Sequence, residues 1–218
     1  MLVATLHALR EEGLGAWGHC GGYNLPHATL TGSVRGDLVF IDAEKSAGGP
    51  CYDSGVHVLD LTLHFMGFPE PVSVSANTWL EIANKPSVMA HSPKKYTVPE
   101  ELAAGFIRFA NGSCISLAAS WALNATGNQN NVSVYGTLGG VQMWPFTLVK
   151  EEYGMMLNCT PQSLGKKGLG GHAEEIKQFV NAILRGGNVP VPPEQSLITQ
   201  RILDGIYKSG QEGKEIVL

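Results

Sequence analysis

Asp53 and His57 are the residues of this chain whose types and spacing most directly suggest chemistry. They lie four residues apart at the start of an apolar run, directly after Gly48-Gly49-Pro50. A spacing of four places two side chains on one face of a helix N-terminus. A carboxylate beside an imidazole can hold the ring in one tautomer and tune it as a general base or acid. The pair is therefore a candidate proton-transfer site.

Two other interpretations of this segment are open. Asp53 could simply cap the helix while His57 is a buried, satisfied side chain. Asp60 and His64 repeat the pattern along the same face, so the four residues could be taken for a metal site. Metal ligands must converge, however, and side chains in line over three helical turns diverge. We therefore predict no metal site.

The element that must position this pair is a helix over residues 54–66. Asp53 or Ser54 is its predicted N-cap, and Gly67 followed by Pro69 ends it. Its apolar positions recur at helical spacing: Val56, Leu59, Leu63 and Met66.

The apolar pattern then changes to a period of two, which is typical of strands. Strands of this kind, in succession and joined by short glycine-containing turns, predict a mostly antiparallel meander. The predicted strands are residues 72–79, 104–109, 114–121, 132–135, 140–143 and 146–151.

The two ends of the chain complete the expected architecture. Residues 2–9 are predicted as a strand, and the glycine-rich residues 13–36 as a long loop. Helices are predicted at 172–184 and 193–209, and a short closing strand at 215–218.

Runs of strands flanked by helices indicate a single α+β domain over residues 1–218, an open, mostly antiparallel sheet with helices packed on one face. Apolar residues occur in both registers of the strands, so the second face must also be covered. We predict a homo-oligomer, dimer or tetramer, packed through the open sheet face. The two registers are Ile115, Leu117 and Phe106, and Ala104, Ile107 and Phe109.

Composition excludes several classes of partner. The 218 residues carry 15 Lys and Arg against 19 Asp and Glu, so the net charge of -4 disfavours nucleic acid. No window approaches the ~18 apolar residues of a membrane span, and the N-terminus lacks a secretory signal pattern. A cytoplasmic location is expected.

The segment Gly48-Gly49 with residues 53–57 and Asp60 resembles the GG(x)nDxGxHxxD signature of the Gfo/Idh/MocA oxidoreductases, the glucose-fructose oxidoreductase and inositol dehydrogenase group. The order and spacing of further segments extend the resemblance over nearly the whole chain. These segments are 106–112, 134–140 and the closing helices through 208–210.

The resemblance implies the C-terminal domain of that family, which is dihydrodipicolinate reductase-like and supplies the substrate pocket and the oligomer sheet. Family members pair it with a Rossmann domain that binds NAD or NADP. His57 would accept the proton of the sugar or polyol hydroxyl being oxidised, with Asp53 as its partner. We also assign Arg10, Asp60 and His172 to substrate binding.

A complete Rossmann domain is not expected in this chain. Such a domain needs more than about 100 residues, and only 52 precede Asp53. Residues 13–18 match GxGxxG by letters, but they follow Arg-Glu-Glu and open no helix. Residues 44–46, Glu-Lys-Ser, match the family's Glu-Lys-Pro by accident. We assign no cofactor-binding residue and expect no cofactor to bind this chain alone.

Two functional hypotheses follow. In the first, the chain is the substrate-binding and oligomerisation half of an NAD(P)-dependent sugar or polyol oxidoreductase, inactive alone, as a truncated reading frame, a fragment or a standalone domain. In the second, it is a non-enzymatic oligomer that binds a carbohydrate or a protein through its sheet.

Overall fold

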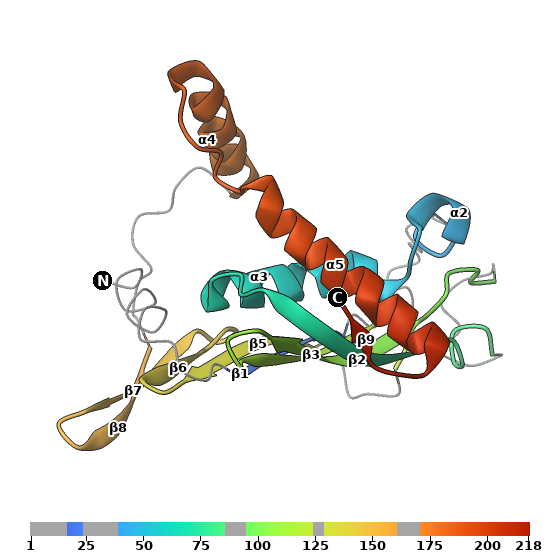
Figure 1. Cartoon of the computed structure of the whole chain (residues 1–218), viewed down its shortest axis with the longest axis horizontal. Coiled ribbons are helices and arrows are strands. Elements are labelled where there is room, and N and C mark those ends of the chain that lie inside the picture. Colours follow the sequence, from blue (N-terminus) through green and yellow to red (C-terminus); the bar gives the residue numbers. More distant parts are fainter. Residues whose placement is uncertain (1–16, 24–38, 86–94, 124–128, 161–170) are drawn as a thin grey trace, which may run out of the picture.

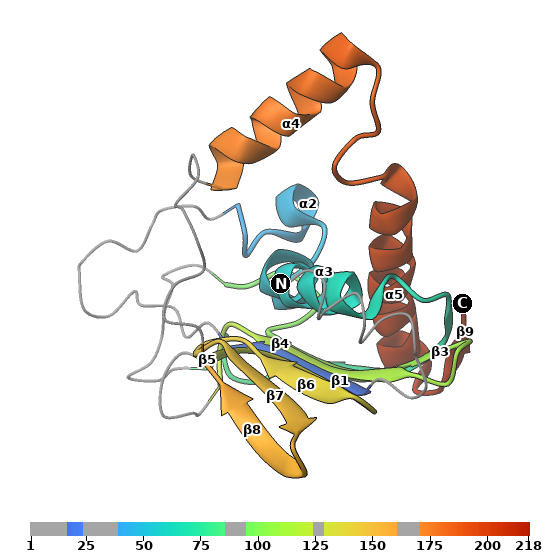
Figure 2. The ribbon, with the colours of Figure 1, turned by 90° about the vertical axis from the view of Figure 1, so that its left-hand side faces the viewer.

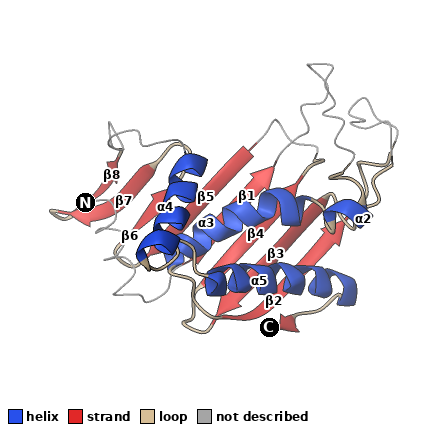
Figure 3. Ribbon diagram, turned by 90° about the horizontal axis from the view of Figure 1, so that it is seen from above, coloured by secondary structure: helices blue, strands red, loops and turns tan. Residues whose placement is uncertain are grey.

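The computed structural model describes residues 17–23, 39–85, 95–123, 129–160 and 171–218. Within these ranges one nine-stranded sheet has the order β8-β7-β6-β5-β1-β4-β3-β2-β9 (Figure 3). The strands are β1 Trp17–Tyr23, β2 Pro71–Trp79, β3 Leu102–Phe109, β4 Cys114–Ser120, β5 Gln129–Gly136, β6 Gly139–Gln142, β7 Thr147–Glu152, β8 Met155–Cys159 and β9 Ile216–Val217.

The predicted fold class is confirmed. Among the described strands only the β1–β4 pair is parallel, and the helices lie on one side of the sheet (Figures 1 and 2). The described helices are α2 Ala43–Ser46, a π-helical turn Cys51–Gly55 that runs directly into α3 Val56–Met66, α4 Gly171–Arg185 and α5 Pro193–Glu212. None of them has the length and apolar character to cross a membrane.

Strand β1 corrects the prediction of a long loop over residues 13–36. It pairs in parallel with β4 on one side and antiparallel with β5 on the other, so the meander is interrupted between β4 and β5. Three of its seven residues are glycine, which has low strand propensity. The strand forms because both of its edges find partners distant in the chain. The predicted strand 2–9 and Arg10 lie outside the described residues.

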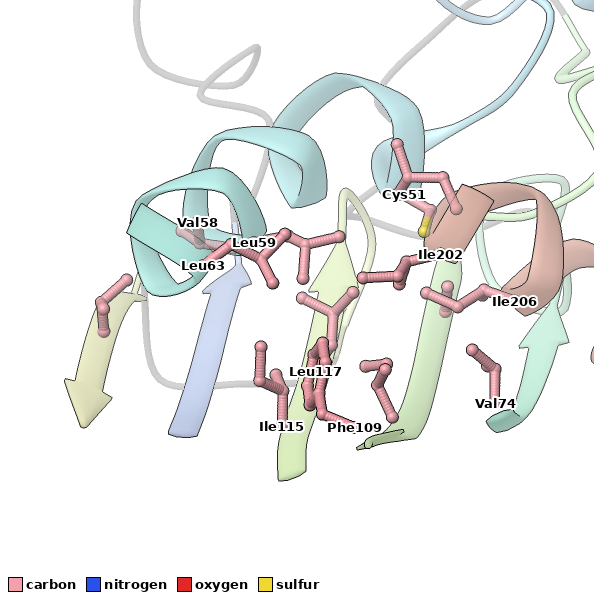
Figure 4. Packing of buried hydrophobic residues seen from close by; sticks show 14 residues of the cluster. Cys51, Val58, Leu59, Leu63, Val74, Phe109, Ile115, Leu117, Ile202 and Ile206 are labelled. Atoms are coloured by element: carbon pink, nitrogen blue, oxygen red, sulfur yellow. The ribbon is translucent and has the colours of Figure 1, made fainter. Parts of the chain in front are cut away.

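The core lies between the sheet and helices α3 and α5 (Figure 4). Each buried Leu or Ile contributes about 1.5–3 kcal/mol through the hydrophobic effect. This packing fixes α3, and with it the candidate pair, against the middle of the sheet. The central side chains are Leu59 and Leu63 of α3, Ile202 and Ile206 of α5, and Val74, Ile107, Ile115 and Leu117 of the sheet.

The two faces of the sheet differ from the predicted registers. Ile107, Phe109, Ile115 and Leu117 are all buried beneath the helices. Phe106 alternates with Ile107 and Phe109 along β3, so it belongs to the opposite face. The prediction was wrong in placing Phe106 with Ile115 and Leu117, because Phe106 pairs with Ser116 and Ile107 with Ile115. The open face of the sheet is therefore less apolar than expected.

Helix α4 forms where the sequence predicts it, but it does not pack on the sheet. It has no buried residue, and its apolar side chains, among them Ile176, Phe179 and Ile183, are exposed in the described structure. In Figures 1 and 2 the helix stands away from the sheet beyond α3 and α5. The expected apolar stripe is therefore present, without the expected contact.

Candidate active site

Asp53 and His57 lie where the chain enters α3. Asp53 is in the π-helical turn and His57 in the first turn of α3. The helical conformation begins before the predicted N-cap, because Pro50 takes the N-cap position and makes no side-chain cap hydrogen bond. The predicted helix end is confirmed. Gly67 adopts a left-handed conformation with φ 83°, and its N–H donates to the carbonyl oxygens of Leu63 and His64.

The carboxylate of Asp53 is held by a residue from the sheet. Trp121, which follows β4 and is only 9% exposed, donates its indole N–H to Asp53 Oδ2 at 3.1 Å. The hydroxyl of Ser54 donates to the same oxygen at 3.2 Å. A hydrogen bond to a charged group stabilises by about 1.5–3 kcal/mol. The orientation of Asp53 is therefore set by a buried tryptophan.

His57 is exposed, and the structure contains no hydrogen bond between it and Asp53. The predicted pairing assumed α-helical geometry, in which residues four apart lie one above the other. The π-helical turn at residues 51–55 has wider hydrogen-bonded turns, so this alignment does not hold. The imidazole is thus open to a ligand from solvent, while the Asp53 carboxylate is held by Trp121 and Ser54.

The start of this helix is capped by a buried carboxylate from the segment before β3. Glu100 Oε2 accepts from the N–H of Gly49 at 3.1 Å, and Oε1 accepts from the N–H of Cys51 at 3.0 Å. The hydroxyl of Tyr207 on α5 donates to Oε1 at 2.7 Å. Burial raises the pKa of Glu100, and the three donors oppose that rise. Burial and the nearby Glu100 also raise the pKa of Tyr207.

The other predicted substrate-binding residues are not gathered around Asp53. Asp60 accepts from the hydroxyl of Thr199 on α5 at 3.3 Å, so its carboxylate contributes to the contact between two helices. His172 is the second residue of α4 and is fully exposed, and its Nδ1 lies 3.7 Å from Glu175 Oε2. It lines a hollow of about 610 Å³ between α4 and the segment leading into α5. Their predicted roles, and that of Arg10, stay predictions.

Trp121 and Glu100 are the site residues that sequence reasoning missed. In the sequence, Trp121 ends the predicted strand 114–121, and nothing in its position indicates a site. Glu100 and Glu101 directly precede β3, and charged side chains of this kind are usually exposed. Two adjacent carboxylates directly before an apolar strand are the one signal that could have drawn attention to the capping role.

The described residues do not fit a dinucleotide. Such a site needs a strand that passes through a glycine-rich turn into a helix whose N-terminus meets the pyrophosphate. The glycine-rich turn before α3 follows helix α2 instead of a strand, and a carboxylate occupies its N–H groups. Within the described ranges no three potential metal ligands cluster.

Comparisons with known proteins agree with this architecture. The model of the oxidoreductase family, C-terminal alpha/beta domain (Gfo/Idh/MocA), matches residues 41–218. The D-glucoside 3-dehydrogenase of Escherichia coli K12 is 27% identical over 220 residues, covering 99% of this chain and 56% of that enzyme. The chain therefore spans little more than half the length of this curated relative.

Solved structures show the same fold. Levoglucosan dehydrogenase in complex with NADH matches with a TM-score of 0.76 at 18% identity, over 99% of this chain and 62% of that one. An aldose-aldose oxidoreductase from Caulobacter crescentus, complexed with glycerol, matches with a TM-score of 0.71 at 16% identity, over 100% and 59%. The chain belongs to the Gfo/Idh/MocA oxidoreductase family and corresponds to its C-terminal α/β domain.

Proposed function

We propose that this chain is the substrate-binding part of an NAD(P)-dependent sugar oxidoreductase, with the cofactor held by a separate nucleotide-binding domain. The observation that carries the proposal is the start of α3, where an exposed His57 follows Asp53, itself fixed by buried Trp121. These residues stand in the segment that resembles the family signature. The comparison proteins support a sugar as substrate, since they are a glucoside dehydrogenase, a levoglucosan dehydrogenase and an aldose oxidoreductase.

Oxidation of a sugar hydroxyl removes a proton from oxygen and a hydride from carbon. The imidazole of His57 is proposed to accept the proton, because it is exposed and a ring nitrogen of a neutral imidazole is a hydrogen-bond acceptor. The fixed carboxylate of Asp53 is proposed to orient either the sugar or the imidazole ring of His57. The hydride needs an acceptor that the described residues have no fold to hold, so only the proton step is assigned to this chain.

Binding of a simple glucoside tests the proposed substrate site. We expect the 218-residue chain to bind methyl D-glucoside with millimolar affinity, about 4 kcal/mol, and the sugar to shift the indole N–H resonance of Trp121 in NMR spectra. Asp53→Ala should abolish the sugar-induced shift. Gln178→Ala, on α4, is the control and should leave it unchanged.

Calorimetry with NAD+ and NADP+ tests the other half of the proposal. We expect no binding heat from the chain alone. Micromolar binding of either nucleotide would contradict the assignment of the cofactor to a separate domain.

We further propose that the open sheet face pairs with a second copy of the chain. Ala104 and Ala118 lie opposite each other at the centre of this face, and the flanking Trp79 and Tyr135 are exposed. Small central residues with aromatic neighbours allow two sheets to approach closely, and a face that no described helix covers is typical of an interface.

Light scattering tests this pairing. The wild-type chain is expected to run as a dimer or tetramer, and Ala118→Arg as a monomer with unchanged helix content, because like charges would meet across the interface. Gln178→Arg on the distant α4 should leave the mass unchanged. A monomeric wild-type chain at every concentration would contradict the pairing.

A further inference from the structure

Two adjacent glutamates, Glu100 and Glu101, are buried to 0% and 1% exposure directly before β3. Burying a carboxylate is costly unless hydrogen bonds compensate for the water that it loses. Each of these carboxylates therefore needs hydrogen-bond donors within the protein, and the two carboxylates have different donors.

Glu101 has a local role. Its carboxylate accepts from the backbone N–H groups of Glu81 at 2.8 Å and Ile82 at 2.6 Å, and also from the N–H of Ala83. These three donors belong to the turn that follows β2. The side chain thus caps one turn, and its three hydrogen bonds do not reach the start of α3.

Glu100 reaches the segment that carries the candidate pair. Its two oxygens accept from the N–H groups of Gly49 and Cys51, on either side of Pro50. No side chain of the helix itself caps this start. Helix N-termini carry unpaired N–H donors and a partial positive charge. A carboxylate accepts hydrogen bonds from those donors, and its negative charge is stabilised there. Glu100 is therefore a cap supplied from a distant part of the chain.

The same carboxylate joins this start to α5. Tyr207 donates its hydroxyl to Glu100 Oε1 at 2.7 Å and accepts from the N–H of Gly49 at 3.3 Å. The ring of Tyr207 stacks on that of Tyr52, with centroids 4.9 Å apart and planes 15° apart. The hydroxyl of Tyr52 in turn donates to Asp204 on α5. The start of the helix is thus fixed to α5 at several points around one carboxylate.

A direct chain of hydrogen bonds leads from Glu100 to Asp53. Gly49 donates its N–H to Glu100, and its carbonyl oxygen accepts from the N–H of Asp53 at 3.1 Å. We propose that Glu100 is a positioning residue that sets where the helix start presents Asp53 and His57. This inference rests on the proposed function of those two residues. Glu100 itself touches no substrate in this scheme.

Glu100→Gln and Glu101→Gln form a matched pair of tests in the full 218-residue chain. Glutamine keeps the size of the side chain, but only its carbonyl oxygen can accept. Its NH2 group, which only donates, replaces one of the two accepting carboxylate oxygens. In Glu100→Gln we expect the amide protons of Cys51 and Asp53 to exchange with solvent about tenfold faster and the ring resonances of His57 to move. In Glu101→Gln we expect the amides of residues 81–83 to change instead.

Tyr207→Phe is a milder second variant that keeps the ring stacked on Tyr52 and removes the donor to Glu100. It should change the same amide and His57 signals in the same direction, by a smaller amount. This variant decides the question if Glu100→Gln does not fold. Unchanged His57 resonances in the folded Glu100 variant, or equal changes in the two glutamate variants, would overturn the positioning role.

These readouts need no catalysis, so they separate this inference from the proposed function. Displaced His57 signals together with an activity that does not depend on His57 would leave Glu100 as the anchor of the helix and refute the proton-transfer role. Undisturbed signals together with an activity that depends on His57 would refute the positioning role alone.

Discussion

Gly49→Ala is expected to lower the free energy of unfolding by at least about 3 kcal/mol. A Cβ atom at this position would lie 2.1 Å from the carbonyl oxygen of Glu100 and 2.7 Å from its Oε1. The carbonyl belongs to the backbone and cannot rotate away as a side chain can, so the helix start or the start of β3 must shift. Thermal unfolding measures the effect, a fall of about 6–12 °C in the midpoint for a chain of this size.

Gly187→Ala is the matched control, because a Cβ at Gly187 would meet no atom within 4 Å. Its free energy of unfolding should stay within about 0.5 kcal/mol of the wild-type value. A Gly49→Ala protein that melts within about 2 °C of the wild type would show that the helix start and Glu100 can separate freely. Such freedom would also contradict the positioning role of Glu100.

The elements with a regular apolar period could be predicted from the sequence. In α3, β3 and β4 the buried residues repeat at helical or strand spacing, because burial on one face forces that repeat. Strand β8 was not predicted. Its Met155 and Met156 are adjacent, both are exposed, and they give no alternation. It forms through pairing with β7 along a sheet edge, which a local pattern does not record.

Strand β1 could not be predicted for a different reason. Gly18, Gly21 and Gly22 lower the propensity of any isolated strand, and the stretch looks like a loop. Its place between β4 and β5 depends on parallel pairing with residues almost 100 positions later in the chain, Trp17 with Cys114 to Tyr23 with Ser120. Partners of this kind are set by the topology of the whole sheet.

The candidate site was predicted in its residues but not in its contacts. Asp53 and His57 are identified by type and spacing, which are local properties. The pairing of Asp53 with Trp121 joins residues 68 positions apart, and that of Gly49 with Glu100 joins residues 51 apart. The sequence does not distinguish a buried glutamate from an exposed one. Only the folded structure shows which glutamates accept hydrogen bonds from a helix start or a turn.

His57→Ala is expected to lower kcat by about 10²- to 10⁴-fold, the usual contribution of a general base. The measurement needs a cofactor domain, so the chain is joined to the part of levoglucosan dehydrogenase, solved in complex with NADH, that this chain does not match. Reduction of NAD+ by a sugar substrate is then followed. Substrate affinity should change much less than kcat, because an exposed imidazole contributes little to binding energy.

His64→Ala is the control for this experiment. His64 is exposed on the same helix seven residues later, and its ring lies edge-on to Phe65 and Phe68. It shares the helix, exposure and residue type of His57 but lies about three turns from Asp53, so its removal should leave kcat unchanged. Equal losses in both variants would mean that the helix had been disturbed. An unchanged kcat in His57→Ala would assign the proton to another group and refute the proposed mechanism, even though the family and the fold would stand.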